Sequence, residues 1–145
     1  MKILIVNGPN LNLVGTREPS VYGSTTFLDF YNELTAVYDD AAAFDYFQSN
    51  VEGELINALQ EAVGTYDAIL LNAGGYTHTS VALGDCVAAI DVPVFEVHIS
   101  NPLAREDFRH TSYISGACAG TVSGFGLDSY RLALEGALAF CNSNS

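Results

Sequence analysis

Basic residues are scarce in this sequence. Five lysines and arginines stand against 17 aspartates and glutamates, so the formal net charge is −12 at pH 7. A surface of this charge repels nucleic acid and anionic membranes, and we expect neither as a partner. An anionic small molecule could bind only where the few cations gather, which makes their positions informative. The cations are Lys2, Arg17, Arg105, Arg109 and Arg131.

Membrane spans, secretion signals and disulfide frameworks are lacking too. The longest apolar runs, such as Ala68 to Leu71 and Val92 to Val97, are far too short to cross a bilayer. The first residues show no long apolar segment and no small-residue cleavage site. Cys86, Cys118 and Cys141 are odd in number and widely spaced, without a CxxC pair. We therefore expect packing cysteines and a cytoplasmic protein.

Several catalytic motifs are absent. The sequence contains no GxSxG, no Walker A motif, and no GxGxxG after its first predicted strand. The only lysine, Lys2, lies at the start of that strand, so a Schiff-base mechanism has no suitable nucleophile. His78, Glu96 and His98 form no HxH or HExxH pair, and we predict no metal site.

Apolar runs and helical patterns alternate along the whole chain. They predict a single domain over residues 1–145 with an α/β fold, a three-layer, doubly wound, five-stranded parallel sheet of flavodoxin-like order 2-1-3-4-5. The expected strands are Lys2–Val6, Tyr46–Gln48, Ala68–Leu71, a strand from Val94, and Gly116–Ser123. The first expected helix begins at Thr25 or Thr26. The other three run from Ser49-Asn50 to about Gly64, from Ser80 to about Ala89, and from Ser129 to about Phe140. Leu55, Ile56, Leu59 and Val63 should face the core from the second helix, and Leu132, Leu134, Leu138 and Phe140 are core candidates in the last.

The stretch from Pro93 to His110 carries an unusual strand. Glu96, His98 and Ser100 fall on one side of its alternation, although a central parallel strand is normally apolar on both faces. The carboxyl ends of strands 1, 3 and 4 would bring Asn7 to Asn10, Asn72 to Ser80 and His98 to Asn101 around one crevice. Turn-forming roles explain Asn7, Gly8 and Gly74 well, but they explain His78 and His98 less well, and His110 could simply be solvated.

A long irregular segment follows the first strand. Leu11 to Ser24 shows no sustained period and contains Arg17, Glu18 and Tyr22, which favours a functional lid over a passive loop. Tyrosine has a pKa of about 10, and a nearby guanidinium favours the phenolate. Arg17 could therefore make Tyr22 a base, although an exposed arginine and a turn tyrosine are also common. Cations, imidazoles and amides around one crevice suit acid–base chemistry on a small carboxylate.

These motifs together resemble type II 3-dehydroquinate dehydratase. The matching segments cover nearly the whole chain in the family's order. They are NGPNLNLVGTREPSVYG (Asn7 to Gly23), FQSNVEGELI (Phe47 to Ile56), NAGGYTHTSVAL (Asn72 to Leu83), FEVHISNPLAREDFRHTSYIS (Phe95 to Ser115) and SGFGLDSYRLAL (Ser123 to Leu134). The family usually has Pro and Ala in place of Ala73 and Gly75, which loosens the turn after Asn72, and often His in place of Val51.

The resemblance implies a flavodoxin-like fold and the reversible, cofactor-free dehydration of 3-dehydroquinate to 3-dehydroshikimate. It implies that Tyr22 removes the proton beside the ketone, with Arg17 holding it as phenolate. A water near Asn10 would help to stabilise the enolate. His98 would protonate the departing hydroxyl, and Glu96 would orient His98.

For substrate binding, the resemblance implies contacts from Asn72, His78, Ser100, the Ile99 backbone and Arg109. Asp85 would reach the site of a neighbouring subunit, because family members assemble as trimers stacked into dodecamers. The reaction serves aromatic biosynthesis, through chorismate, or quinate breakdown.

Three other functions are compatible with the fold class. An acidic flavodoxin-like protein that binds flavin or another small molecule would share the size and charge, but NGPNLNL is no Ser/Thr/Gly-rich phosphate loop. A receiver-type signalling domain would need acidic residues after strand 1 and a lysine after strand 5, and the sequence has neither. A catalytically inactive interaction module stays open.

Overall fold

A five-stranded parallel sheet forms the centre of the molecule. The computed structural model describes residues 1–16 and 24–144, and in these the strand order is β2-β1-β3-β4-β5, as predicted. The strands are β1 (Lys2–Asn7), β2 (Ala43–Gln48), β3 (Ala68–Asn72), β4 (Val94–His98) and β5 (Gly120–Ser123). Strands β3 and β4 are buried along their whole length, which explains their nearly continuous apolar sequence.

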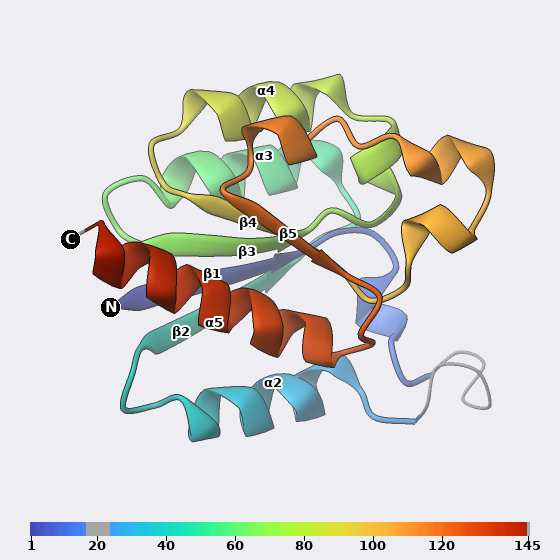
Figure 1. The fold of residues 1–145 in the computed structure, drawn as a ribbon. Coiled ribbons are helices and arrows are strands. Elements are labelled where there is room, and N and C mark those ends of the chain that lie inside the picture. The colour runs from blue at the N-terminus through green and yellow to red at the C-terminus, as the bar shows by residue number, and fades with distance from the viewer. Residues whose placement is uncertain (17–23, 145) are drawn as a thin grey trace.

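Helices cover both faces of the sheet and make three layers (Figure 1). The helices α3 (Glu52–Glu61) and α4 (Val81–Ala89) lie on one face, while α2 (Phe27–Val37) and α5 (Asp128–Ser143) lie on the other. Thr26 caps α2 and Ser80 caps α4, each through a side-chain oxygen that accepts a backbone N–H. The doubly wound α/β architecture is therefore confirmed. No helix among the described residues has the length and hydrophobicity of a membrane span.

The two halves of the core differ in composition. Between the sheet and α3/α4 the buried side chains are Leu, Ile, Val, Ala and one cysteine, Cys86, with no buried aromatic ring among the described residues. Between the sheet and α2/α5, rings from Phe27, Tyr46 and Tyr130 pack with centroids 4.9 Å apart. One layer is therefore held by aliphatic packing and the other by an aromatic cluster.

Four sequence predictions need correction. β5 begins at Gly120 and not at Gly116, because Ser115–Ala117 forms a 3-10 turn, η5, before the chain pairs with β4. β2 is longer than expected, since all six residues of Ala43–Gln48 pair with β1. Val63 is 46% exposed because α3 ends two residues before it, at Glu61, and Phe140 is 39% exposed at the rim of the sheet, where its ring meets Phe95.

Candidate active site

Strands β1, β3 and β4 end at Asn7, Asn72 and His98, at one edge of the sheet. Asn7 and Asn72 are direct register partners, and β3 pairs with β4 on its other side. The 3-10 segments η1 (Leu11–Leu13), η2 (Gly74–His78), η3 (Pro102–Ala104) and η4 (Asp107–His110) continue the chain from this edge (Figure 1). The structure therefore brings together the three polar segments that the sequence places around one crevice.

A buried carboxylate and an imidazole meet on β4. Glu96 is 1% exposed and His98 is 8% exposed, and Nε2 of His98 bonds to Oε2 of Glu96. The Ser115 hydroxyl donates to Oε1 of Glu96 at 2.5 Å, and the Ser112 hydroxyl donates to the same oxygen at 3.1 Å. Burial raises the pKa of Glu96, but the bonds from His98, Ser115 and Ser112 outweigh it and bring the pKa below its usual value. Glu96 is thus an ionised, fully hydrogen-bonded partner for His98.

His78 faces His98 across this edge. The two imidazole rings lie nearly parallel, at 21°, with centroids 6.3 Å apart. Nδ1 of His78 lies 2.7 Å from the backbone carbonyl oxygen of Thr111. A carbonyl can only accept, so Nδ1 carries a proton and Nε2 of a neutral His78 is left as an acceptor. An imidazole at the end of η2 and an imidazole at the end of β4 therefore lie side by side.

The segment after β4 supplies the local cations. Arg105 donates to the Ser100 hydroxyl at 3.3 Å, while Nε of Arg109 donates to Glu106 at 2.5 Å. Gly126 N–H donates to the Ile99 carbonyl at 3.0 Å, so a ligand contact from the Ile99 backbone would use its N–H. Two other arginine or lysine side chains, Lys2 and Arg131, pair elsewhere with Asp45 and Asp128. Among the described residues, positive charge near the histidines thus comes from Arg105 and Arg109.

The turn after β1 is held close to the turn after β3. A Cβ on Gly8 would lie 2.5 Å from the carbonyl oxygen of Ala73, so only glycine allows this approach. Asn10 has a left-handed backbone, with φ at 70°, and its N–H donates to Oδ1 of Asn50 at 3.0 Å. Backbone geometry therefore fixes Asn10 beside the carboxyl end of β1.

Asn72 belongs to a buried hydrogen-bond chain. Its Nδ2 donates to the Tyr130 hydroxyl at 2.9 Å, and Tyr130 in turn donates to Oδ1 of Asn7 at 2.7 Å. Oδ1 of Asn72 accepts the N–H of Gly74 at 3.1 Å. The amide is placed by Tyr130 and the backbone at Gly74, so the unusual Ala73 and Gly75 do not loosen it. One N–H of the Asn72 amide is left for a ligand.

We expect Tyr130→Phe to lower the free energy of unfolding by about 2–6 kcal/mol. Tyr130 is 0% exposed, and its loss leaves Nδ2 of Asn72 and Oδ1 of Asn7 buried without this partner, at about 1–3 kcal/mol each. Urea unfolding measures the change. Tyr38→Phe is the control, since Tyr38 donates to Glu135 near the surface and should cost under about 1 kcal/mol. Equal effects for both variants would show that the buried chain adds nothing.

One predicted site residue, Asp85, stands apart from this cluster, and two others are not described. Arg17 and Tyr22 lie outside the described residues. Asp85 is exposed on α4 and makes no side-chain hydrogen bond or ion pair within residues 1–16 and 24–144. Conversely, Ser112, Ser115 and Tyr130 were not predicted as site residues, although the two serines bond to Glu96 and the tyrosine to Asn72.

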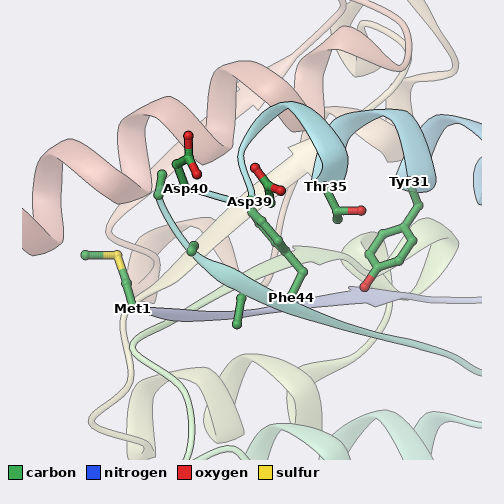
Figure 2. A pocket seen from close by; sticks show the side chains of 9 residues that line it. Met1, Tyr31, Thr35, Asp39, Asp40 and Phe44 are labelled. Atoms are coloured by element: carbon green, nitrogen blue, oxygen red, sulfur yellow. The ribbon is translucent and has the colours of Figure 1, made fainter.

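Two cavities lie elsewhere, on either side of β2. One, of about 550 Å³, is bordered by Tyr31, Asp39, Asp40 and Phe44 between α2 and the start of β2 (Figure 2). The other, of about 490 Å³, lies between β2 and α3. No predicted site residue lines either cavity. The candidate site is therefore the group of side chains at the carboxyl ends of β1, β3 and β4, and not one of these cavities. Among the described residues, no three His, Cys, Asp or Glu side chains are grouped to hold a metal.

Comparison with known proteins gives a consistent result. The model of the family "Dehydroquinase class II" matches residues 1–138. A 3-dehydroquinate dehydratase of Prochlorococcus marinus is 52% identical over 141 residues, covering 97% of each chain. A 3-dehydroquinate dehydratase of Campylobacter hominis is 48% identical and covers 95% of this chain and 90% of its own. The crystal structure of a type II dehydroquinase from Butyrivibrio crossotus superposes with a TM-score of 0.89 at 39% identity, covering 94% of this chain and 97% of the other.

Proposed function

Because this chain belongs to the class II dehydroquinase family, we propose that it is a hydro-lyase that converts 3-dehydroquinate reversibly to 3-dehydroshikimate. The single observation that carries this proposal is the pairing of a buried, ionised Glu96 with His98 at the sheet edge. An acidic flavodoxin-like carrier is not favoured, since the family match and the relatives are dehydroquinases.

The reaction needs one base and one acid. Tyr22, held as phenolate by Arg17, removes the proton on the carbon beside the ketone, and the electron pair becomes an enolate. A water near Asn10 stabilises the enolate oxygen. As the ketone re-forms, the carbon–oxygen bond to the neighbouring hydroxyl breaks, and His98 supplies the proton with which that hydroxyl leaves as water. The hydrogen bond between His98 and Glu96 supports the role of His98 as the acid that protonates the leaving hydroxyl.

Binding of the anionic substrate uses the remaining groups at the edge. Asn72 offers an amide N–H, His78 an acceptor nitrogen, and Ser100 a hydroxyl beside the N–H of Ile99. Arg109 is held by Glu106 in the same loop and closes on the hydroxyl side of the substrate. These contacts orient the ring so that the base and the acid act on adjacent carbons.

Asp85 acts, in this proposal, in the site of a neighbouring subunit. Its exposed place on α4, without a partner in the described part of its own chain, supports this role. The proposed assembly is a dodecamer of four trimers, and a monomer mass in light scattering would contradict it. The three cysteines are free thiols, which fits a cytoplasmic enzyme that serves aromatic biosynthesis through chorismate or quinate breakdown.

The test is to add 3-dehydroquinate to the purified protein and follow the ultraviolet absorbance of the conjugated enone product. We expect the absorbance to rise without any added metal or cofactor. Sodium borohydride added with the substrate should leave the activity intact, because the only lysine, Lys2, lies at the opposite end of β1 from the site. A folded protein that produces no enone would refute the proposed activity.

A further inference from the structure

Two serines from one irregular segment converge on Glu96. Ser112 lies between η4 and η5 and Ser115 is the first residue of η5, 16 and 19 residues beyond the carboxylate that they contact. This segment is tied down at the residue after Ser112. Tyr113 N–H donates to the Thr77 carbonyl at 2.9 Å, and the Tyr113 carbonyl lies against Gly84 of α4, where no side chain would fit. On the other side of Ser112, the Thr111 carbonyl oxygen lies 2.7 Å from Nδ1 of His78. The serines are therefore held in place by the backbone and do not follow Glu96.

The direction of the Ser112 hydrogen bond follows from its other partners. Oγ of Ser112 accepts the N–H of Ile114 at 3.2 Å and the N–H of Ser115 at 3.1 Å. A hydroxyl oxygen has two lone pairs and one hydrogen, and both lone pairs are taken. Its hydrogen can only be donated, and it points to Glu96, whose oxygens lie 3.1 and 3.3 Å away.

The hydrogen bond between Glu96 and His98 has a fixed direction as well. Glu96 must accept from Ser112, and the bonds from His98, Ser115 and Ser112 together hold its pKa below the usual value, so Glu96 is a carboxylate. A carboxylate has no hydrogen to give, so Nε2 of His98 must donate to it. The proton that His98 gains or loses at the sheet edge is then the one on Nδ1, which makes no hydrogen bond to a described residue.

We propose that Ser112 is a positioning residue: its hydroxyl sets the direction of the hydrogen bonds through Glu96 and so selects Nδ1 of His98 as the nitrogen that exchanges a proton with the substrate. This role rests on the proposed dehydratase function, in which His98 is the acid. Ser112 does not touch the substrate. Ser115 adds a second donor to the carboxylate without fixing the direction, since its oxygen accepts no backbone N–H in the described residues.

Within residues 1–16 and 24–144, few titratable groups lie around Glu96. His98 lies on the same strand, Cys118 lies just before β5, and His78 faces His98 from η2. Burial, together with the charge of Glu96, raises the pKa of the Cys118 thiol to about 12, so this group stays neutral and brings no second negative charge. Among the described residues, His78 and His98 are therefore the groups whose titration must be separated from that of Glu96.

The experiment compares Ser112→Ala with wild type by two readouts. The first is the ¹³C NMR titration of the Glu96 carboxyl in protein without substrate, and the second is the acid limb of kcat against pH. Removing a hydrogen bond to a carboxylate raises the pKa of that carboxyl by roughly one unit. We therefore expect the midpoints of both curves to move to higher pH by about one unit. KM at neutral pH should change little. Nitrogen-15 NMR of His98 in wild type should show the neutral ring protonated on Nε2.

Three further variants separate positioning from a general loss of structure. Ser112→Thr keeps the hydroxyl, and both of its curves should match those of wild type. Ser115→Ala should also raise the pKa of Glu96, and it leaves the two backbone hydrogen bonds of Ser112 in place. Ser80→Ala removes a comparable serine, the cap of α4, but touches no titratable group and should shift neither curve. The proposal is overturned if folded Ser112→Ala titrates like wild type, if Ser80→Ala shifts equally, or if neutral His98 carries its proton on Nδ1. If wild type forms no enone, the dehydratase function falls, while the NMR titration still decides the role of Ser112.

Discussion

The variant His98→Asn is expected to lower kcat for 3-dehydroquinate by about 10²–10⁴-fold, the usual contribution of a general acid or base. Asparagine keeps a polar side chain at the end of β4 but cannot carry a proton to the leaving hydroxyl. The Glu96 carboxylate would still be held by Ser112 and Ser115, so the strand should keep its structure. The enone absorbance measures kcat, and calorimetric titration with the substrate should show that binding survives.

His110→Asn is the matched control for this variant. His110 is exposed, and Nε2 contacts only the carbonyl of Arg105 at 3.2 Å among the described residues. Its replacement should leave kcat within about twofold of wild type, as expected for a surface change. The assignment of His98 as the acid would be wrong if His98→Asn kept kcat within tenfold, or if both variants lost activity alike.

Tyr22→Phe should be equally severe, lowering kcat by about 10²–10⁴-fold or more while substrate binding persists. The change removes only the ionisable oxygen and keeps the ring. Arg17 is expected to lower the pKa of Tyr22, since a neighbouring positive charge favours the phenolate. Tyr66 shows the opposite environment, because its hydrogen bond to Asp45, with burial, raises its pKa to about 12.

Tyr66→Phe therefore serves as the control for Tyr22→Phe. Tyr66 contacts Asp45 at the outer strand β2, and its replacement should leave kcat unchanged. A second measurement sharpens the assignment: exchange of the substrate proton beside the ketone with solvent deuterium should stop in Tyr22→Phe. Continued exchange at the wild-type rate would show that another group is the base.

The site residues on β4 could be predicted because side chains two residues apart in a strand point to the same face of the sheet. Glu96 and His98 are two residues apart, so they had to share a face, and the structure joins them directly. Ser112 and Ser115 could not be found in this way, because they reach Glu96 from an irregular segment whose path is set by contacts with Thr77 and Gly84. Their only sequence signal is a serine pair three residues apart after the η4 basic residues.

Tyr130 was missed for a different reason. In a helix with leucines at regular spacing, a buried tyrosine is indistinguishable from a core aromatic, and its ring does pack in the core. Only the fold shows that its hydroxyl meets Asn72, 58 residues earlier in the chain. The start of β5 was misplaced because Gly116 to Ala119 has small side chains and no period, so backbone pairing with β4 alone decides where the strand begins.

The unequal composition of the two core layers determines what optical spectroscopy can observe. The chain has no tryptophan, and the aromatic cluster around Phe27, Tyr46 and Tyr130 lies entirely between the sheet and α2/α5. Near-ultraviolet circular dichroism arises from immobilised aromatic rings, so its signal from fully buried rings comes from this layer, while the other layer adds only the partly buried Phe47, Tyr66 and Tyr76. Far-ultraviolet circular dichroism reports on all helices. If α3 and α4 loosened alone, far-ultraviolet intensity would fall while the near-ultraviolet band of the aromatic core persisted. If instead both signals are lost in the same unfolding transition, the layers on the two faces of the sheet unfold cooperatively.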